Sequence, residues 1–406
     1  MSNLNATPAS ERVHIGIFGK RNAGKSSLIN ALTGQDLAIV SSIRGTTTDP
    51  VYKAMELLPL GPVMFIDTPG IDDEGTLGSQ RVQKAYQVLN KTDIAVLVLD
   101  AVTGPGPEDQ LLLAQILSRK LPVVIVYNKS DLPLGKVITP KETPGAVTCR
   151  VSSTSKTGIR ELKEILARLQ PQSTMAPPLV ADLLHPGDMI VLVVPVDSAA
   201  PKGRLILPQQ QTIRDILDAG AHALVTKEDS LKETLAALKA KPQLVITDSQ
   251  AFKKVNADTP SDILLTSFSI LMARHKGNLE SAVKGVLAFQ NLQDGDKVLI
   301  AEGCTHHRQC EDIGTVKMPN WVENFTGKKL QFTWTSGGEF PAELSTFKLI
   351  IHCGGCMLNE KEMQHRYQEA LAQKIPMTNY GLAIAHMHGI LKRSLSIFPE
   401  LAAQLK

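Results

Sequence analysis

A phosphate-binding loop stands near the start of the chain. Two glycines, a lysine and a serine follow the spacing GxxxxGKS, between an apolar run at 13–18 and a helix-forming stretch at 27–32. The eight residues are Gly19, Lys20, Arg21, Asn22, Ala23, Gly24, Lys25 and Ser26. In a loop of this kind the backbone amides surround the phosphates of a nucleotide. The sequence therefore predicts that the chain hydrolyses or senses a nucleoside triphosphate.

Each fixed position of this loop has a physical role. Gly19 and Gly24 let the backbone approach the phosphates, and Lys25 brings positive charge to the β- and γ-phosphates. Ser26 offers a hydroxyl to Mg²⁺. The other loop residues that we expect to bind the nucleotide are Asn22, Ala23 and Ser27.

A second motif predicts which base is bound. The apolar run Ile125–Tyr127 ends in Asn128, Lys129, Ser130 and Asp131, the NKxD motif of the GTPase superfamily. A carboxylate at Asp131 can accept hydrogen bonds from N1 and the exocyclic amino group of guanine, whereas adenine lacks this donor pair. GTP is therefore favoured over ATP. Further along, Ser152 and Ser153 resemble the last base-contacting loop of such domains.

Two switch segments complete the predicted GTPase set. Asp67 begins a DxxG element that ends in Gly70; its carboxylate would support Mg²⁺, and the Gly70 amide would reach the γ-phosphate. The segment 44–49 resembles switch I, with Thr47 as our choice of Mg²⁺ ligand and Thr48 as its rival. The residues expected to act in catalysis are Asn22, Lys25, Thr47 and Gly70.

Cysteines predict a second site in the last third of the chain. Cys353 and Cys356 form a CxxC turn around two glycines, and Cys304 lies about fifty residues before them. Five cysteines, an odd number, do not suggest a disulfide framework, so a metal explains the cluster better. Each group follows an expected strand, 297–301 or 347–351. If these strands are parallel, both groups lie at the strands' carboxyl ends, where ligands usually bind.

The chemistry of this site leaves two alternatives. An iron-sulfur cluster with three cysteine ligands and an exchangeable fourth ligand is the preferred interpretation. Tetrahedral zinc with three cysteines and His306 is the competitor. The fourth ligand of a cluster is also open between His306 and Glu311, because a carboxylate is more easily displaced from iron than a thiolate.

Composition limits the class of protein. The chain has 406 residues, enough for two to four domains, and its formal net charge is +3. This charge and the 4% of aromatic residues do not favour a nucleic-acid surface. Because no apolar run reaches the ~18 residues of a membrane span and the first twelve residues lack a signal-peptide core, we expect a cytoplasmic protein without a membrane partner.

The apolar periodicity and the proline-containing polar breaks between periodic segments predict an α/β chain of three domains. These are a P-loop GTPase domain at 1–172, a small α/β domain at 173–266 that we expect to pack against a copy of itself or against the neighbouring domain, and an α/β domain at 267–406 that carries the iron-sulfur cluster. The middle domain is expected to contain strands at 189–196, 221–226 and 243–247, with helices at 211–219 and 230–239. The last is expected to contain strands at 297–301, 330–334 and 347–351, with helices at 278–289, 361–374 and 380–395.

The GTPase motifs resemble the tRNA-modification branch of the translation-factor class. This resemblance implies that Asn22 helps to bind a potassium ion beside the phosphates, where the cation does part of the work of an arginine finger. Many GTPases place a water-orienting glutamine directly after the DxxG glycine. Here that residue is Ile71, so we expect slow intrinsic turnover. A substitute carboxylate could come from the acidic segment 72–74.

The whole chain is similar to the FeFe-hydrogenase maturation GTPases, the HydF family. The resemblance rests on the order of a GTPase domain, an α/β module, and then CxH and HCxxC at Cys304, His306, His352, Cys353 and Cys356. It implies a 4Fe-4S cluster on the three cysteines and a homodimer formed through the middle domain. It also implies a carrier that takes a di-iron precursor, made with two radical-SAM maturases, to the apo-FeFe-hydrogenase. The alternative is a tRNA-modification or ribosome-assembly GTPase with a structural zinc site.

Overall fold

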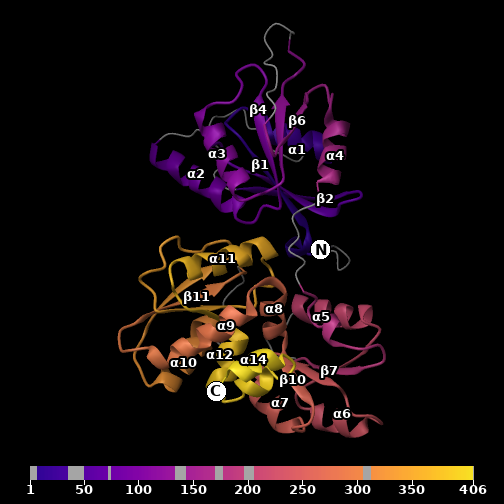
Figure 1. Ribbon diagram of the computed structural model, residues 1–406, viewed down its shortest axis with the longest axis vertical. Coiled ribbons are helices and arrows are strands. Elements are labelled where there is room, and N and C mark those ends of the chain that lie inside the picture. Colours follow the sequence, from indigo (N-terminus) through magenta and orange to yellow (C-terminus); the bar gives the residue numbers. More distant parts are fainter. Residues whose placement is uncertain are drawn as a thin grey trace. The chain divides into compact units, whose positions relative to one another are not determined.

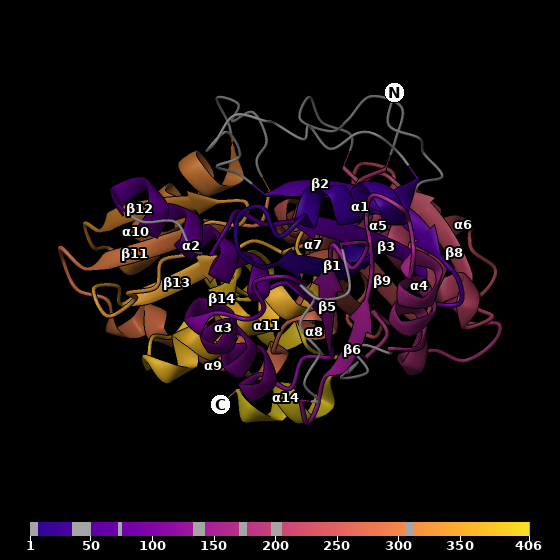
Figure 2. The same cartoon turned by 90° about the horizontal axis from the view of Figure 1, so that it is seen from above.

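The structure is a computed structural model that divides into two compact units, Met1–Thr174 and Met175–Lys406. We describe each unit by itself (Figures 1 and 2). For residues 75–81 only the backbone is described. The described residues are 7–34, 50–71, 75–132, 143–169, 177–195, 205–304 and 312–405.

The first unit contains a six-stranded sheet with the order β2-β3-β1-β4-β5-β6. Only β2 runs antiparallel to its neighbour β3; the other neighbouring strands are parallel. The strands are β1 (Val13–Phe18), β2 (Val51–Leu57), β3 (Gly61–Asp67), β4 (Ile94–Asp100), β5 (Val123–Asn128) and β6 (Val147–Arg150). Residues of β4 and β5 are buried almost throughout, as expected for central strands of a parallel sheet that is covered on both faces.

Helices cover both faces of this sheet, and Figure 2 shows α3 and α4 on either side of its strands. The helices are α1 (Lys25–Thr33), α2 (Gly75–Leu89), α3 (Pro107–Ser118) and α4 (Ile159–Arg168). One apolar core joins α1 and α4 to the sheet through residues such as Leu28 and Leu162. A second core, on the other face, joins α2 and α3 through residues such as Leu89 and Ile116. This arrangement directs the loops after β1, β3 and β5 to one edge of the sheet.

The second unit contains two four-stranded parallel sheets, with the orders β10-β9-β7-β8 and β12-β11-β13-β14. The first comprises β7 (Met189–Val193), β8 (His222–Thr226), β9 (Leu244–Thr247) and β10 (Leu264–Ser267). The second comprises β11 (Lys297–Glu302), β12 (Gln331–Ser336), β13 (Leu349–His352) and β14 (Met377–Asn379). A single apolar core runs through both sheets, so this unit is one packed body.

One helix, α8, lies between the two sheets of the second unit and is buried on nearly every side. It contacts α5 of the first sheet and α9, α11 and α12 of the second. Because β10 runs directly into α8 at Ser267, the helix is fixed from its first residue. The helices are α5 (Leu207–Asp218), α6 (Leu231–Ala237), α7 (Phe252–Asp258), α8 (Phe268–Lys276), α9 (Leu279–Val286), α10 (Met318–Thr326), α11 (Glu360–Ala372), α12 (Tyr380–Met387), α13 (Leu391–Ser394) and α14 (Pro399–Gln404).

The predicted helix at 380–395 was wrong as a single element. The chain forms α12 up to Met387, breaks, and begins α13 at Leu391. Gly389 has a φ of 70°, a left-handed conformation that ends the first helix. The apolar periodicity continues across the break, which is why the sequence suggested one helix.

No helix in the described part of the chain is both long enough and apolar enough to span a lipid bilayer.

A glycine in α9 provides a test of how closely this helix packs on β14. A Cβ on Gly285 would lie 2.2 Å from the Met377 carbonyl oxygen of β14. Replacing glycine with alanine in a helix normally stabilises by ~1 kcal/mol. Because the clash is with backbone, we expect Gly285→Ala to destabilise this unit by about 1–3 kcal/mol in urea denaturation.

The control for this substitution is its neighbour. Lys284 is exposed on the same helix and pairs with Glu280, so Lys284→Ala should change stability by no more than ~0.5 kcal/mol. A Gly285→Ala chain that is more stable than the parent would contradict the close packing of α9 on β14.

Candidate functional site

The phosphate loop connects β1 to α1, and its two glycines are required by their surroundings. Gly19 has a φ of 141°, and a Cβ there would lie 2.3 Å from the Val98 carbonyl oxygen. Gly24 has a φ of 91°, and a Cβ there would lie 2.2 Å from the side-chain nitrogen of Asn128. Side chains at either position would push the loop away from the neighbouring strand ends. Between the glycines, Ala23 is buried and Asn22 is exposed.

Lys25 is the buried cation of this loop. Its Nζ donates hydrogen bonds to the carbonyl oxygens of Gly19 and Lys20, both at 2.8 Å. These bonds hold the ammonium inside the curve of the loop. Its neighbour Ser27 lies half-buried in the first turn of α1.

Ser26 and Asp67 meet at the end of β3. The Ser26 hydroxyl donates to Asp67 Oδ2 at 2.5 Å. The other carboxylate oxygen, Oδ1, is buried and has no hydrogen-bond partner among the described residues. Burial raises the pKa of Asp67, and the Ser26 hydrogen bond and the Lys25 charge oppose that rise. A hydroxyl beside a carboxylate with an unused oxygen suits Mg²⁺, which prefers oxygen ligands. Gly70, three residues further, is also buried.

The base-recognition loops are tied directly to the phosphate loop. Asn128, the last residue of β5, donates from Nδ2 to the Ala23 carbonyl oxygen at 3.0 Å. Its Oδ1 accepts from the Ser153 amide at 3.1 Å and from the Ser153 hydroxyl at 3.0 Å. Buried Ser152 accepts from the amide of Ser155. One amide side chain therefore holds three loops together at the sheet edge.

Asp100 is a residue of this site that the motifs did not indicate. It ends β4, and its Oδ2 lies 2.6 Å from the Nζ of Lys129. Lys129 has a left-handed φ of 64°, which brings the NKxD motif around the strand end. Asp131, two residues on, is exposed at the rim. The sequence could have indicated Asp100, because this acid ends the apolar run that precedes the one leading into the NKxD motif.

Several predicted residues lie outside the described part of the chain. They are Thr47 with its rival Thr48, the acidic segment 72–74, and both candidates for the fourth cluster ligand, His306 and Glu311.

The cysteine groups lie at one edge of the second sheet in this unit. Strands β11 and β13 are parallel neighbours, with Ala301 opposite His352. The Cys353 amide donates to the Ala301 carbonyl oxygen at 2.9 Å, and the Gly303 amide donates to Cys353 Sγ at 3.0 Å. Cys304 directly follows Gly303. The register thus brings two remote segments of the chain to the same strand ends.

Burial is the main influence on the pKa values of the three thiols. Burial raises the pKa of Cys304 to about 12, and the charges of Cys353 and Cys356 add to that rise. Burial raises the pKa of Cys353 to about 11, opposed by amide hydrogen bonds from Gly303 and Gly355. The pKa of Cys356 is also raised by burial, and the Lys276 charge opposes that rise.

These residues suit a metal by the kind of donor atoms that they offer. Within the described ranges, no group of three or more Cys, His, Asp and Glu side chains has the arrangement that holds a metal ion. The three cysteine sulfurs, one of which accepts hydrogen bonds from the Gly303 and Gly355 amides, nevertheless match the soft donor set and N–H···S bonds of iron-sulfur and zinc sites. The segment 305–311, directly after Cys304, lies outside the described residues.

His352 is fully buried behind the cysteines, and both of its ring nitrogens are used. Nε2 lies 2.9 Å from Nη1 of Arg366, and Nδ1 lies 2.7 Å from the Cys353 carbonyl oxygen. A guanidinium only donates, so Nε2 accepts and Nδ1 carries the proton. Burial and the Arg366 charge lower the pKa of His352 to about 3. His352 is therefore uncharged, and its two ring contacts support the turn between Cys353 and Cys356.

Arg366 and its partner Glu362 were not indicated by the sequence. Arg366 is fully buried on α11, and two of its nitrogens donate to Glu362 Oε1 at 3.0 Å. A third contact joins it to the Gly337 carbonyl oxygen at 2.7 Å. Charged residues in a helix usually lie in solvent, and only the i,i+4 spacing of this pair could have drawn attention to it.

Comparison with known families decides the classification. Residues 179–277 match the family model "Hydrogen maturase F dimerization domain", and residues 280–397 match "Hydrogen maturase F tetramerization domain". The chain belongs to the HydF family of hydrogenase maturation GTPases. Residues 14–129 of this family member match the model "50S ribosome-binding GTPase", in agreement with its P-loop GTPase fold. The dimerization and tetramerization models support self-association.

The proteins MnmE and Der match this HydF-family chain in its GTPase domain alone. The tRNA modification GTPase MnmE of Laribacter hongkongensis is 35% identical over 157 residues, which are 38% of this chain and 34% of the relative. GTPase Der of Kosmotoga olearia is 37% identical over 127 residues, which are 30% and 28% of the two chains. The chain thus spans about a third of the length of these relatives.

Among solved structures, a variant of Aquifex aeolicus Era bound to GDP.AlF4- is 23% identical. The match covers 53% of this chain and 93% of that chain, with a TM-score of 0.35.

The Asn128 contacts generate a prediction for nucleotide binding. Asn128→Ala removes the hydrogen bonds to Ala23 and Ser153 that hold the phosphate and base loops together. Losing buried hydrogen bonds of this kind costs about 1–3 kcal/mol, so we expect the Kd for a fluorescent GDP analogue to rise tenfold or more. The matched control is Ser155→Ala, because the exposed Ser155 hydroxyl bonds to Thr157 within the same loop. Equal effects of the two substitutions would show that the loops do not depend on Asn128.

Proposed function

We propose that this chain is a GTP-hydrolysing scaffold that binds a 4Fe-4S cluster and carries a di-iron precursor to apo-FeFe-hydrogenase. Cys304, Cys353 and Cys356 would hold the cluster. The observation that carries the proposal is the parallel register of β11 and β13, which brings the CxxC turn beside Gly303 and Cys304. Family membership supplies the hydrogenase context.

The GTPase half has the groups that phosphate-bond cleavage needs. Lys25 would neutralise charge on the β- and γ-phosphates, and the oxygens of Ser26 and Asp67, which meet at the end of β3, would hold Mg²⁺. Thr47 would complete the Mg²⁺ ligands, and the Gly70 amide would bind the γ-phosphate. Asp131 would accept the guanine hydrogen bonds, beside Asn128, Lys129 and the serines 152 and 153. These residues position and neutralise the substrate; none of them needs to form a covalent bond.

Potassium is proposed as the additional charge at the phosphates. Asn22 is exposed and has a left-handed φ of 58°. Ile71 is buried and apolar, so it cannot orient the attacking water. A cation held by the Asn22 amide oxygen would stabilise the negative charge that spreads over the phosphates during cleavage.

Release of cargo requires a weak ligand. Three thiolates would hold the cluster firmly, and His306 or Glu311 would occupy an exchangeable fourth position. When bound, the cluster supplies an iron with one replaceable ligand. The chain's own contribution is to keep the cysteine turn rigid through His352 and the buried Arg366.

Nucleotide state would control partner choice. We propose that GTP binding and hydrolysis change the affinity for the two radical-SAM maturases and for the apo-hydrogenase. Segments that are ordered by a γ-phosphate and released by its loss are a common means of such control. The alternative of tRNA modification has less support, because the likeness to MnmE is confined to the GTPase domain.

The cluster proposal is tested by anaerobic purification. We expect brown protein with iron and acid-labile sulfide, whereas Cys353→Ser should lose both and fail to mature the hydrogenase. GTP turnover should stay within about twofold of the parent, since the GTPase domain has its own sheet and cores. Cys149→Ala is the control, because Cys149 is a buried thiol of that domain. Colourless protein with one zinc per chain would overturn the proposal in favour of a structural site.

The potassium proposal is tested at Asn22. Asn22→Gly keeps the left-handed backbone and removes only the amide side chain. We expect GTP turnover by the parent to be at least about tenfold faster in potassium than in sodium, as for loss of one charge-stabilising group. The variant should still bind GDP through the backbone amides of the loop, and its turnover should respond equally to both salts. Equal rates in the parent chain would refute the role of potassium.

A further inference from the structure

Lys276, the last residue of α8, supports the cysteine turn from a distant part of the sequence. Its side chain is buried, with only 3% of the residue exposed. The Nζ donates to the Cys356 carbonyl oxygen at 3.0 Å and to the Leu358 carbonyl oxygen at 2.9 Å. A buried ammonium is costly unless it is hydrogen-bonded, so these carbonyls and the lysine hold each other in place. The turn that carries Cys356 is therefore attached to the end of α8.

Earlier residues of α8 contact the same region. Gly354, inside the CxxC turn, faces Ser269, because a Cβ on this glycine would lie 3.7 Å from the Ser269 hydroxyl. The Ser269 carbonyl oxygen accepts from Asn379 at 2.7 Å, and its hydroxyl accepts from the Gly381 amide at 3.2 Å. Ser269, near the start of α8, therefore lies beside the cysteine turn and is held there by Asn379 and Gly381.

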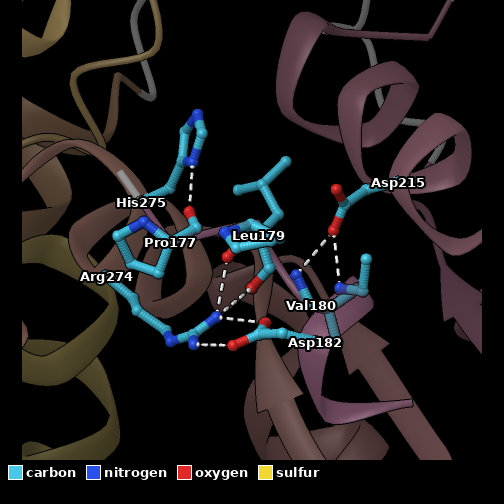
Figure 3. Close-up of polar contacts among 9 residues, drawn as sticks. Pro177, Leu179, Val180, Asp182, Asp215, Arg274 and His275 are labelled. Carbon is cyan, nitrogen blue, oxygen red and sulfur yellow. Dashed lines mark hydrogen bonds and ion pairs between the residues drawn. The ribbon is translucent and has the colours of Figure 1, made fainter. Parts of the chain in front are cut away.

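The two residues before Lys276 hold a different segment (Figure 3). His275 Nδ1 lies 2.7 Å from the Pro177 carbonyl oxygen. Arg274 donates from Nη1 to the Pro178 carbonyl oxygen at 2.7 Å and to Asp182 Oδ1 at 2.9 Å, and its Nη2 makes a second, shorter bond to Asp182. This bidentate pair fixes the direction of the segment as well as its position.

The held segment is the start of the second unit. Asp215 of α5 accepts from the amides of Val180 and Ala181, both at 2.7 Å, which secures the segment from its other side (Figure 3). In the sequence, Pro177 follows the connection 170–176, which leads back to α4 of the GTPase unit. Within the second unit, Arg274 and His275 therefore hold the first described residues after this connection.

We propose that the last turn of α8 couples the segment arriving from the GTPase unit to the Cys353-x-x-Cys356 turn. Arg274 and His275 hold the arriving segment, and Lys276 is the positioning residue for the cysteine turn. A rigid helical turn connects these contacts, because consecutive residues of a helix are only ~1.5 Å apart along its axis. This coupling gives a physical route for nucleotide control of the metal site, and in that sense it rests on the proposed function.

The first test is hydrogen–deuterium exchange on the full-length, metal-free chain. Arg274→Met should speed exchange about fivefold or more at 177–182 and also at 353–358, since loosening one contact of the turn loosens the other. Lys276→Met should speed exchange at 353–358. Asp182→Asn weakens the Arg274–Asp182 ion pair at its half-exposed member. It should reproduce the Arg274→Met exchange pattern without disturbing the core.

Arg214→Met is the matched control, because Arg214 makes an exposed i,i+4 pair with Asp218 in the same unit. It should leave both segments unchanged. If Arg274→Met and Asp182→Asn speed exchange only at 177–182, the Arg274–Asp182 ion pair acts only locally and the coupling is refuted. This outcome is independent of the cluster, because the chain is measured without metal.

The second test follows the nucleotide. In the parent chain, replacing GDP with a non-hydrolysable GTP analogue should change exchange at 353–358, and Arg274→Met should abolish that change while nucleotide affinity stays the same. No nucleotide effect in the parent would overturn the coupling, even if anaerobic samples contain iron and sulfide. Conversely, a nucleotide effect in a chain that binds only zinc would support the coupling and refute the cluster proposal.

Discussion

The parallel pairing of β11 with β13 is the constraint on which the cysteine site depends. With Ala301 opposite His352, the chain leaves both strands at the same edge, and the Cys353 amide bonds back to Ala301. A slip of one residue would turn the CxxC turn to the other face of the sheet and separate it from Cys304. Arg366 opposes such a slip, because it bonds to His352 at the end of β13 and to Gly337 directly after β12. These two strands lie on either side of β11.

The nucleotide loops follow the same physical logic in the first unit. Strands β1, β4 and β5 are parallel neighbours, so residues that follow them meet at one edge. Asn128 then joins the phosphate loop to the base loop, and Asp100 orients Lys129. Both halves of the chain therefore build a site from short loops on a rigid parallel sheet, which allows small polar contacts to set the geometry.

Motifs with fixed spacing could be predicted, whereas supports that depend on tertiary contact could not. The GxxxxGKS loop and the strands before the cysteines follow from local pattern and burial, since these signals lie within a few residues. Lys276, Arg366 and Glu362 look like solvated helix residues until packing buries them. The helix α8 itself was missed, because a helix buried on nearly every side has no amphipathic period. Thr47, His306 and Glu311 stay predictions.

The shared core of the second unit has a consequence for how this protein can be divided. The two hydrogen maturase F models meet between residues 277 and 280, yet apolar side chains of both sheets pack into one cluster across that boundary. Cutting there would expose core residues such as Ile270 and Val286 to water. Truncated pieces would aggregate, so recombination in evolution or in the laboratory should exchange the two modules as a pair.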